Sequence, residues 1–255
     1  TVLVGISYVY NHGENLGFSE VIYPQNTAAP PDLATGTCRV RRDPHEGPLD
    51  LEEVDPGDYG LQEDVTKETR QRILRDRKIT QLTIDWLKEK AGGMDRPWVV
   101  TMGLIKPHPP FVTSDPGLWE HYKDRADLPV AGADAESARH PYSLDLRASH
   151  GRSYSQDVIR RRRAGYYARV SELDREIGTV IETLRELELL ETTNIVYASD
   201  HGDMLGTFGL WGKNILFEDA VRIPMIACGS DYPAGSRVRT PVDLHDLQAS
   251  IFQSC

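Results

Sequence analysis

The hydrophobic residues of this chain fall into short continuous runs that are separated by longer amphipathic segments. Apolar runs over 1–7, 97–105 and 222–228 predict strands. A fourth run, from Ile195 to Ala198, is β-branched and aromatic, and a turn-rich segment follows it. A run of this kind is typical of a buried strand in a parallel sheet.

Two other segments carry apolar residues at intervals of three and four. The first predicts a helix over 64–91, with Asp64 as N-cap and the pair Gly92–Gly93 as its stop. The second predicts the longest helix, over 155–190. It contains four consecutive cations, Arg160 to Arg163. Because successive helical residues point about 100° apart, these four cannot face one ligand, and we expect a solvated surface.

Two long segments, 24–64 and 112–154, lack a clean hydrophobic period. The first is rich in Pro, Asp, Glu and Gly and predicts an irregular excursion. The second suits a short helix from Trp119 to Tyr122 and then a loop. Loops of this length are commonly functional, so we expect both segments to form lids or insertions. A further short helix is expected over 214–220.

The composition of the chain limits the kinds of molecule that we expect it to bind. The chain has 255 residues and a net charge of -10 at pH 7, which argues against nucleic acid or an anionic membrane surface as the main partner. No apolar run approaches the roughly 18 residues of a membrane span. The three cysteines, Cys38, Cys228 and Cys255, have no close spacing and indicate neither a zinc ribbon nor a disulfide framework. This usage favours a reducing, cytoplasmic setting.

Candidate metal chemistry follows the strand over 195–198. Asp200 offers a hard oxygen and His201 a nitrogen, just past the expected carboxyl end of the strand, where ligands bind in open α/β sheets. Such a pair suits Mn²⁺, Zn²⁺ or Ca²⁺, but this stretch supplies no further ligands. The alternative is a turn in which Asp200 is an N-cap. Lys213 follows in a glycine-rich loop, as a cation near the expected anion site.

Four motifs in this region match in order and spacing. The segments Ser199 to Gly206, Gly209 to Lys213, Phe217–Glu218 and Val221 to Pro224 resemble the signature of the sulfatases. These belong to the alkaline phosphatase superfamily, in which the phosphonate monoester hydrolases are close relatives. The resemblance implies that Asp200 and His201 bind one divalent ion, Ca²⁺ or Mn²⁺. It also implies that Lys213 contacts the sulfate or phosphate group.

A second motif lies after the strand over 97–105. The segment Lys106 to Phe111 resembles a Lys-Pro-His-x-Pro-Phe motif of the same family. The resemblance implies that His108 contacts a sulfate or phosphate oxygen or the leaving group. A lone histidine in a loop is otherwise more often structural. Lys106 either adds positive potential at the substrate or lies on the surface.

The start of the chain departs from the sulfatase pattern. Ile6 and Tyr8 stand where many sulfatases have the Lys and His of a Gly-Lys-x-His motif. Phosphonate monoester hydrolases also lack that pair and carry hydroxyl groups there. The resemblance therefore makes Ser7 and Tyr8 candidates for hydrogen bonds to substrate. Hydrogen bonds from these hydroxyl groups to the backbone are the alternative.

The nucleophile motif of the family, Cys or Ser followed by x-Pro, is absent from the sequence given. Cys38 with Arg42 is the nearest match, but it lacks the Pro and stands in the wrong order, so we expect a surface loop. The resemblance implies a nucleophile, formylglycine being one form, in a segment before residue 1, and a carboxyl-terminal subdomain after residue 255. We therefore expect these 255 residues alone to lack turnover.

Together these patterns predict one α/β domain over 1–255, a three-layer α/β/α sandwich with a mixed, mainly parallel sheet of the alkaline phosphatase type. The implied function is metal-dependent hydrolysis of a small anionic sulfate ester. Two alternatives stay open: a phosphonate monoester or phosphodiester hydrolase of the same superfamily, and a non-catalytic domain that keeps the scaffold. A homo-oligomer also stays open.

Overall fold

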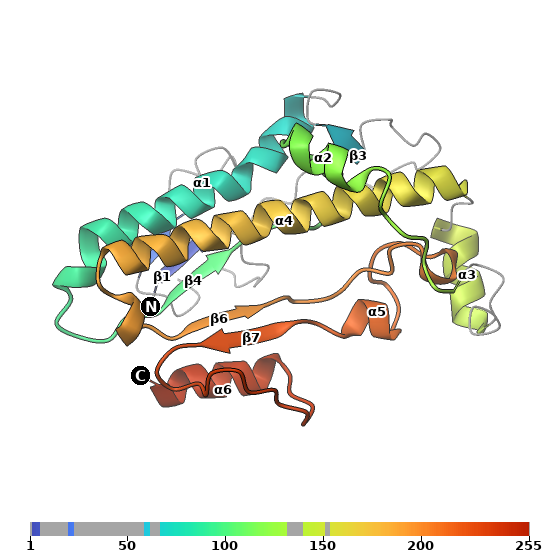
Figure 1. Ribbon diagram of the computed structural model, residues 1–255. Coiled ribbons are helices and arrows are strands. Elements are labelled where there is room, and N and C mark those ends of the chain that lie inside the picture. The colour runs from blue at the N-terminus through green and yellow to red at the C-terminus, as the bar shows by residue number, and fades with distance from the viewer. Residues whose placement is uncertain are drawn as a thin grey trace, which may run out of the picture. The chain divides into compact units, whose positions relative to one another are not determined.

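The computed structural model describes residues 2–5, 20–22, 59–61, 67–131, 140–150 and 154–254 (Figure 1). The chain divides into two compact units. Unit 1 comprises Thr1–Trp119 with Gly165–Leu187, and unit 2 comprises Glu120–Ala164 with Glu188–Cys255. The long helix α4, Gln156–Glu186, contributes residues to both.

Unit 1 contains a parallel three-stranded sheet in the order β2-β1-β4. The central strand β1 (Val2–Gly5) pairs with β2 (Glu20–Ile22) and with β4 (Val100–Gly103). Helix α1 (Lys67–Lys90) contacts β1 and β4 (Figure 1). The strands expected over 1–7 and 97–105 are confirmed, whereas β2 was not predicted because three residues show no period.

Helix α1 buries the apolar stripe that predicted it. Ile79, Ile84, Trp86 and Leu87 are all buried, and their burial against the unit supplies the main stabilisation of such a helix. The helix ends at Lys90 and passes into the 3-10 turn η4 (Ala91–Gly93), as the glycine pair predicted. The expected cap, Asp64, lies outside the described residues.

A second parallel pair in unit 1 joins β3 (Tyr59–Leu61) to β5 (Phe111–Thr113). Helix α4 passes close to β5, because a Cβ atom on Gly165 would lie 2.0 Å from the carbonyl oxygen of Phe111. Only glycine permits this approach. After β5, Asp115 accepts the backbone N–H groups of Gly117 and Leu118 and so caps helix α2 (Pro116–Tyr122).

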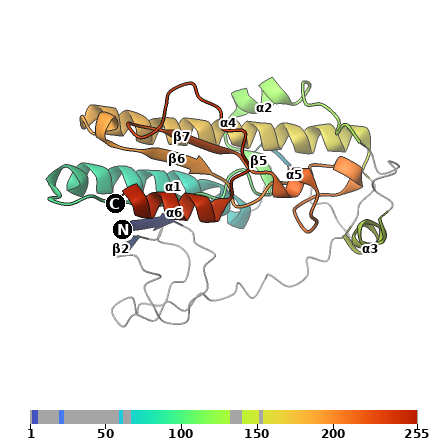
Figure 2. The same ribbon diagram turned by 90° about the horizontal axis from the view of Figure 1, so that it is seen from below.

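Unit 2 contains the strand that precedes the predicted metal pair. β6 (Ile195–Ala198) has the bounds that the apolar run predicted, and it pairs with β7 (Met225–Cys228), as Figure 2 shows. The pairing is antiparallel, with Ile195 opposite Cys228, and the four β6 residues are half-buried. The expectation of a buried strand with parallel neighbours is therefore wrong for this pairing, because the chain returns along β6 after the loop that follows it.

The remaining elements of unit 2 are short. They are α3 (Pro141–His150), η6 (Leu190–Thr192), η7 (Thr207–Gly209), α5 (Glu218–Val221) and α6 (Leu244–Ser254). Met204, Leu210, Ile215 and Ala220, all from the segment between β6 and β7, form a small buried core. The helix expected over 214–220 begins later, at Glu218.

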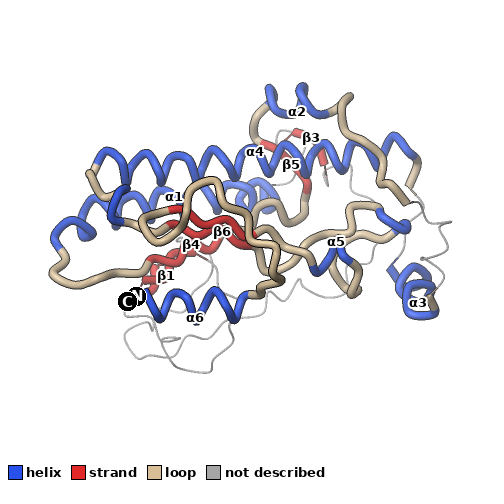
Figure 3. Tube along the Cα trace, turned by 60° about the horizontal axis from the view of Figure 1, so that its bottom comes forward, coloured by secondary structure: helices blue, strands red, loops and turns tan. Residues whose placement is uncertain are grey.

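Figure 3 distinguishes the helices of the described residues, in blue, from the strands, in red. Helix α3 lies inside the segment 112–154, where only a short helix and a loop were expected. Most of the segment 24–64 lies outside the described residues, although β3 falls within it. In the described part of the chain, no helix has the length and apolar character needed to cross a membrane.

Candidate active site

The loop after β6 is held mainly by its own backbone. The N–H of Gly202 donates to the carbonyl oxygen of Ala220 (2.8 Å), and the N–H of Met204 donates to that of Gly212 (2.8 Å). A Cβ atom on Gly202 would lie 2.0 Å from the carbonyl oxygen of Asp219. Backbone therefore packs directly on backbone at the residue that follows the Asp-His pair.

Two charged side chains complete the anchoring of this loop. Asp203 Oδ1 accepts the N–H groups of Leu205 (2.9 Å) and Gly212 (3.1 Å), and so joins the two sides of the loop. Arg163 from α4 donates to the carbonyl oxygen of Leu205 (2.9 Å) and binds both carboxylate oxygens of Asp127. These contacts fix the backbone between His201 and Lys213.

The four consecutive arginines on α4 form the expected solvated surface only in part. Arg160 and Arg161 are exposed, as predicted, but Arg162 and Arg163 are buried. The Arg162 guanidinium carbon lies 4.6 Å from the ring centroid of Trp211 and 5.2 Å from that of Tyr154. A planar cation can stack on aromatic rings while its stem is buried, so charge alone did not predict exposure.

Asp200, His201 and Lys213 lie together at the end of β6. The Nζ atom of Lys213 lies 2.5 Å from Nε2 of His201, and Oδ2 of Asp200 lies 3.5 Å from the same nitrogen. The side chain of Asp200 is 64% exposed and that of His201 is 29% exposed. The group is therefore accessible to an ion or a small anion in solvent.

The imidazole of His201 has one nitrogen bound to the backbone and the other turned towards Asp200 and Lys213. Its Nδ1 lies 2.8 Å from the carbonyl oxygen of Gly202, which can only accept, so Nδ1 carries the proton of the neutral ring and Nε2 carries the lone pair. Two ligands about 2.4 Å from one Ca²⁺ stand roughly 3.4 Å apart at a right angle. The 3.5 Å between Nε2 and Asp200 Oδ2 fits that spacing.

These two residues are an incomplete ligand set. Among the residues that the structure describes, no cluster of three or more His, Cys, Asp or Glu side chains is arranged to hold a metal ion. The pair thus fits two positions of a divalent ion, and further ligands would come from elsewhere.

The loop after β4 carries His108 and is held at its start by Asp76 of α1. The two carboxylate oxygens of Asp76 accept the backbone N–H groups of Ile105 (2.9 Å) and Lys106 (2.8 Å). The N–H of His108 then donates to the carbonyl oxygen of Ile105 (2.9 Å). Nδ1 of His108 lies 3.0 Å from the carbonyl oxygen of Pro109, so the proton of the neutral ring lies on Nδ1.

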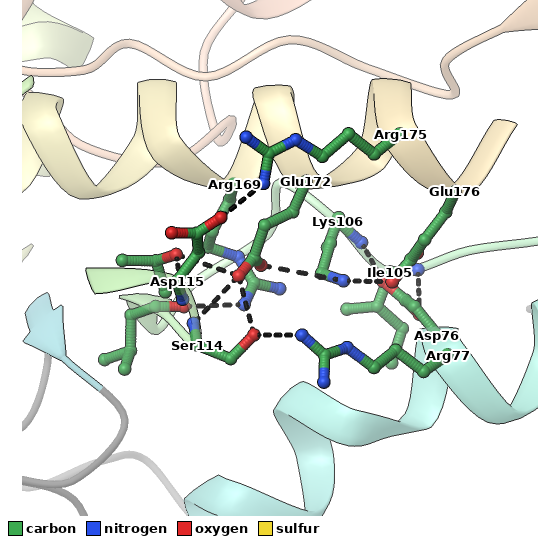
Figure 4. Close-up of polar contacts among 12 residues, drawn as sticks. Asp76, Arg77, Ile105, Lys106, Ser114, Asp115, Arg169, Glu172, Arg175 and Glu176 are labelled. Carbon is green, nitrogen blue, oxygen red and sulfur yellow. Dashed lines mark hydrogen bonds and ion pairs between the residues drawn. The ribbon is translucent and has the colours of Figure 1, made fainter. Parts of the chain in front are cut away.

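Lys106 lies in the interior of unit 1. Its side chain is only 1% exposed, and its Nζ lies 2.6 Å from Glu176 Oε1 and 3.6 Å from Glu172 Oε2 (Figure 4). The expectation that it lies on the surface is wrong, because the tethered backbone directs the stem towards two carboxylates of α4. Its substrate-binding role stays a prediction.

The pKa values of the two glutamates near Lys106 are shifted in opposite directions. Burial raises the pKa of Glu176 above its ordinary value. Burial also opposes ionisation of Glu172, but the Lys106 charge and the hydrogen bonds from Ser114 and Thr113 outweigh it and hold the pKa of Glu172 below its usual range. Lys106 thus lies closer to the carboxyl group whose pKa is raised than to the one whose pKa is lowered.

Of the other candidate residues, Ser7, Tyr8 and Cys38 lie outside the described residues. His108 belongs to unit 1, whereas Asp200, His201 and Lys213 belong to unit 2. The convergence of His108 and Lys213 on one anion therefore stays a prediction.

Sequence reasoning missed three acidic residues that organise the His108 loop. Asp76, Glu172 and Glu176 were not among the candidate residues drawn from the sequence. The four-residue spacing of Glu172 and Glu176 places both carboxylates on one face of α4, which was a usable signal. No local signal connects Asp76 to amides about thirty residues away.

Comparison with known proteins adds the family. Residues 6–254 match the Sulfatase family model. The chain is 32% identical over 183 residues to choline-sulfatase of Rhizobium meliloti (strain 1021), covering 70% of this chain and 35% of that protein. It is 30% identical over 200 residues to arylsulfatase K of Canis lupus familiaris, covering 72% of this chain and 37% of that protein.

A solved structure gives the same indication. The phosphonate monoester hydrolase of Silicibacter pomeroyi superposes with a TM-score of 0.60 and 28% identity, covering 68% of this chain and 37% of that one. The chain thus spans a little over a third of the length of these relatives. Since the family model matches nearly every residue, this chain belongs to the sulfatase family.

Proposed function

We propose that this chain carries part of the active site of a metal-dependent hydrolase of sulfate esters. The observation that carries the proposal is the exposed group Asp200, His201 and Lys213 at the end of β6, in a chain of the sulfatase family. Relatives named choline-sulfatase and arylsulfatase K support a sulfate ester as the substrate class. In an acidic chain, such an anion requires a local cationic site.

In this proposal Asp200 and His201 are two of the ligands of one divalent ion, Ca²⁺ or Mn²⁺. When bound, such an ion stabilises negative charge on the nucleophile and on the transferring group. The hydrogen bond from His201 Nδ1 to Gly202 leaves the Nε2 lone pair as the one that would bind the ion. A nucleophile, formylglycine in the family pattern, completes the proposed site, and Ser7 and Tyr8 stay candidates for substrate binding.

The contact between Lys213 and His201 depends on whether a metal ion is bound to His201. Its ammonium group shares the lone pair of His201 Nε2, which is the electron pair that a metal ion would take. The two cations therefore exclude each other at this atom. With a metal ion bound at Nε2, the ammonium of Lys213 would be free to contact the negative sulfate group and offset its charge.

His108 acts as a proton donor to the leaving oxygen. Because Nδ1–H is held by the carbonyl oxygen of Pro109, only Nε2 is oriented for proton transfer. In the imidazolium form Nε2–H donates towards the leaving group while Nδ1–H keeps its backbone partner. General-acid assistance of this kind accelerates a reaction by about 10²–10⁴-fold.

Metal binding is the first test. Asp200→Asn and His201→Ala should each weaken Mn²⁺ binding by about 10-fold or more in calorimetric titration of the full-length protein, because each removes a ligand. The chain offers a matched control in Asp243 and His245, a second pair 3.3 Å apart whose histidine is 92% exposed. His245→Ala should leave the affinity unchanged. Equal loss at both pairs would indicate nonspecific binding and contradict the site.

A second candidate function is hydrolysis of phosphonate monoesters or phosphodiesters. The superposition on the phosphonate monoester hydrolase favours it. Assays of the full-length protein with an aryl sulfate, an aryl phosphonate monoester and a phosphodiester separate the two. We expect the highest kcat/KM with the sulfate ester. A preference for the phosphonate would replace the first proposal with the second, and no hydrolysis of any ester would favour the non-catalytic alternative.

A further inference from the structure

We propose that Asp76, Lys106 and the two carboxylate partners of Lys106, Glu172 and Glu176, are positioning residues that hold the loop bearing His108 between two helices. This inference rests on the proposed function for its kinetic consequence, but its structural content concerns the loop alone. It gives Lys106 a role through His108 in place of direct contact with substrate. Figure 4 shows these side chains, from α1, α4 and the loop, converging on one another.

The amino-terminal side of the loop is held from α1 by Asp76. This residue is almost fully buried, and its two oxygens take the N–H groups of two consecutive residues, Ile105 and Lys106. A carboxylate that accepts two adjacent amides fixes both the position and the direction of the chain. The turn from Ile105 to His108 is closed by its own backbone hydrogen bond, so the direction set by Asp76 passes to His108.

The same side of the loop is held from α4 through Lys106. The buried ammonium pairs with Glu176 at 2.6 Å and faces Glu172 at 3.6 Å. Because these carboxylates lie four residues apart on a helix, they form one rigid acceptor surface. The stem of Lys106 thus joins the residue two positions before His108 to α4.

The chain beyond the loop, at the end of β5, is tied to the same two helices. Glu172 Oε1 accepts hydrogen bonds from Thr113 Oγ1, Ser114 N and Ser114 Oγ, each at 2.8 Å. Arg77, which follows Asp76 on α1, donates to Ser114 Oγ at 2.6 Å. Each helix therefore contacts both sides of the loop, and His108 lies between the two attachments.

Stability alone is a weak explanation for this arrangement. Withdrawing charges from water costs several kcal/mol per ion, and well-packed apolar residues often replace a buried ion pair at no loss of stability. The buried cluster also includes Arg169, which donates to the carbonyl oxygen of Val112. What apolar residues cannot do is accept backbone N–H groups at defined points, and the cluster does this on both sides of His108.

A spectroscopic experiment tests the structural content. The double variant Lys106→Met/Glu176→Gln removes one charge of each sign and keeps the side-chain lengths close. We expect a folded protein in which the ring ¹⁵N signals of His108, assigned with His108→Ala, change from the Nδ1–H tautomer to a mixture of both tautomers. Lys90→Met is the matched control, since it breaks an exposed lysine–glutamate pair in the same unit. It should leave the His108 signals unchanged.

A folded double variant that keeps the wild-type ring ¹⁵N signals of His108 would overturn the proposal. If the double variant does not fold, Ser114→Ala serves instead, because it deletes only the hydroxyl that bridges Glu172 and Arg77. The same change or constancy of the His108 signals then decides.

A kinetic cycle in the full-length protein tests the action through His108. The double variant should lower kcat/KM by about 10–100-fold when His108 is present, as expected for a small misplacement of a reacting group. In the His108→Ala background it should change kcat/KM by about 2-fold or less. An equal factor in both backgrounds would show a general structural effect and overturn the proposal. If the wild type hydrolyses no ester, the proposed function fails, and the ¹⁵N result still decides the loop.

Discussion

The two loops that carry the candidate catalytic residues are held by different physical means. The His108 loop depends on buried charges, with Asp76, Lys106 and Glu172 nearly inaccessible to water. The loop from Asp200 to Lys213 depends on main-chain hydrogen bonds and on glycine, while its charged ends reach solvent. One loop is fixed by side chains from neighbouring helices, and the other mostly by its own backbone.

This difference predicts which substitutions each loop tolerates. The loop after β6 has no space for an added carbon atom at Gly202, where backbone packs on backbone, but its main-chain hydrogen bonds depend little on the protonation of neighbouring side chains. A loop held by buried carboxylates accepts changes at its surface but responds to any unbalanced charge. Three sets of variants, from the largest expected effect to the smallest, sharpen the contrast.

The largest effect is expected at Gly202. The substitution Gly202→Ala forces a Cβ atom against the carbonyl oxygen of Asp219 and should destabilise unit 2 by about 3 kcal/mol, measured by urea denaturation. Gly178→Ala is the control, because no atom lies within 4 Å of the added carbon. In a helix interior that change should stabilise by about 0.5–1 kcal/mol. Similar stability of the two variants would show that the loop yields at Gly202.

An intermediate effect is expected at Arg163. Arg163→Met removes the hydrogen bonds to Asp127 and to the Leu205 carbonyl and should cost about 2 kcal/mol of unfolding free energy. Arg161, two residues earlier on α4, pairs with Asp157 in an exposed i,i+4 contact. Arg161→Met should cost only about 0.3–0.5 kcal/mol. Equal costs in parallel denaturation curves would mean that burial of Arg163 contributes nothing.

The smallest effect is a change in pH dependence in unit 1. The pKa of Glu172 is lowered in the fold, so its contribution to stability is present above the ordinary value of 4.5 and is lost as the pH falls through the lowered pKa. The pKa of Glu176 is raised, so its contribution has the opposite sign and is lost as the pH rises through the raised pKa. The two trends partly cancel in the wild type.

Single variants separate these trends. Glu172→Gln should flatten the acid loss of unfolding free energy, and Glu176→Gln should make it steeper. Glu120→Gln, at an exposed surface pair, should leave the profile unchanged. The check is unfolding free energy against pH from neutral to acid, and the same slope in the Glu172 and Glu176 variants would remove the assigned signs.

The sequence by itself determined the local elements and the polar residues that follow them. The strand Ile195–Ala198 has the predicted bounds, and the long amphipathic stripe became α4. The adjacency of Asp200 and His201, and the short loop to Lys213, are properties of the chain itself. Hydrophobic periodicity and turn-forming residues act over a few positions, so both can be recognised in the sequence without knowledge of the fold.

Only the tertiary structure decided which charges are buried and which strands pair. Lys106 meets Glu176 across 70 positions, and Asp76 meets the loop amides across about 30. Arg162 and Arg163 became interior groups because aromatic rings, a carboxylate and a carbonyl oxygen happen to face them. The antiparallel partner of β6 likewise depends on how the chain returns. The free energy of a charge depends on its surroundings, and those surroundings are set by contacts distant in sequence.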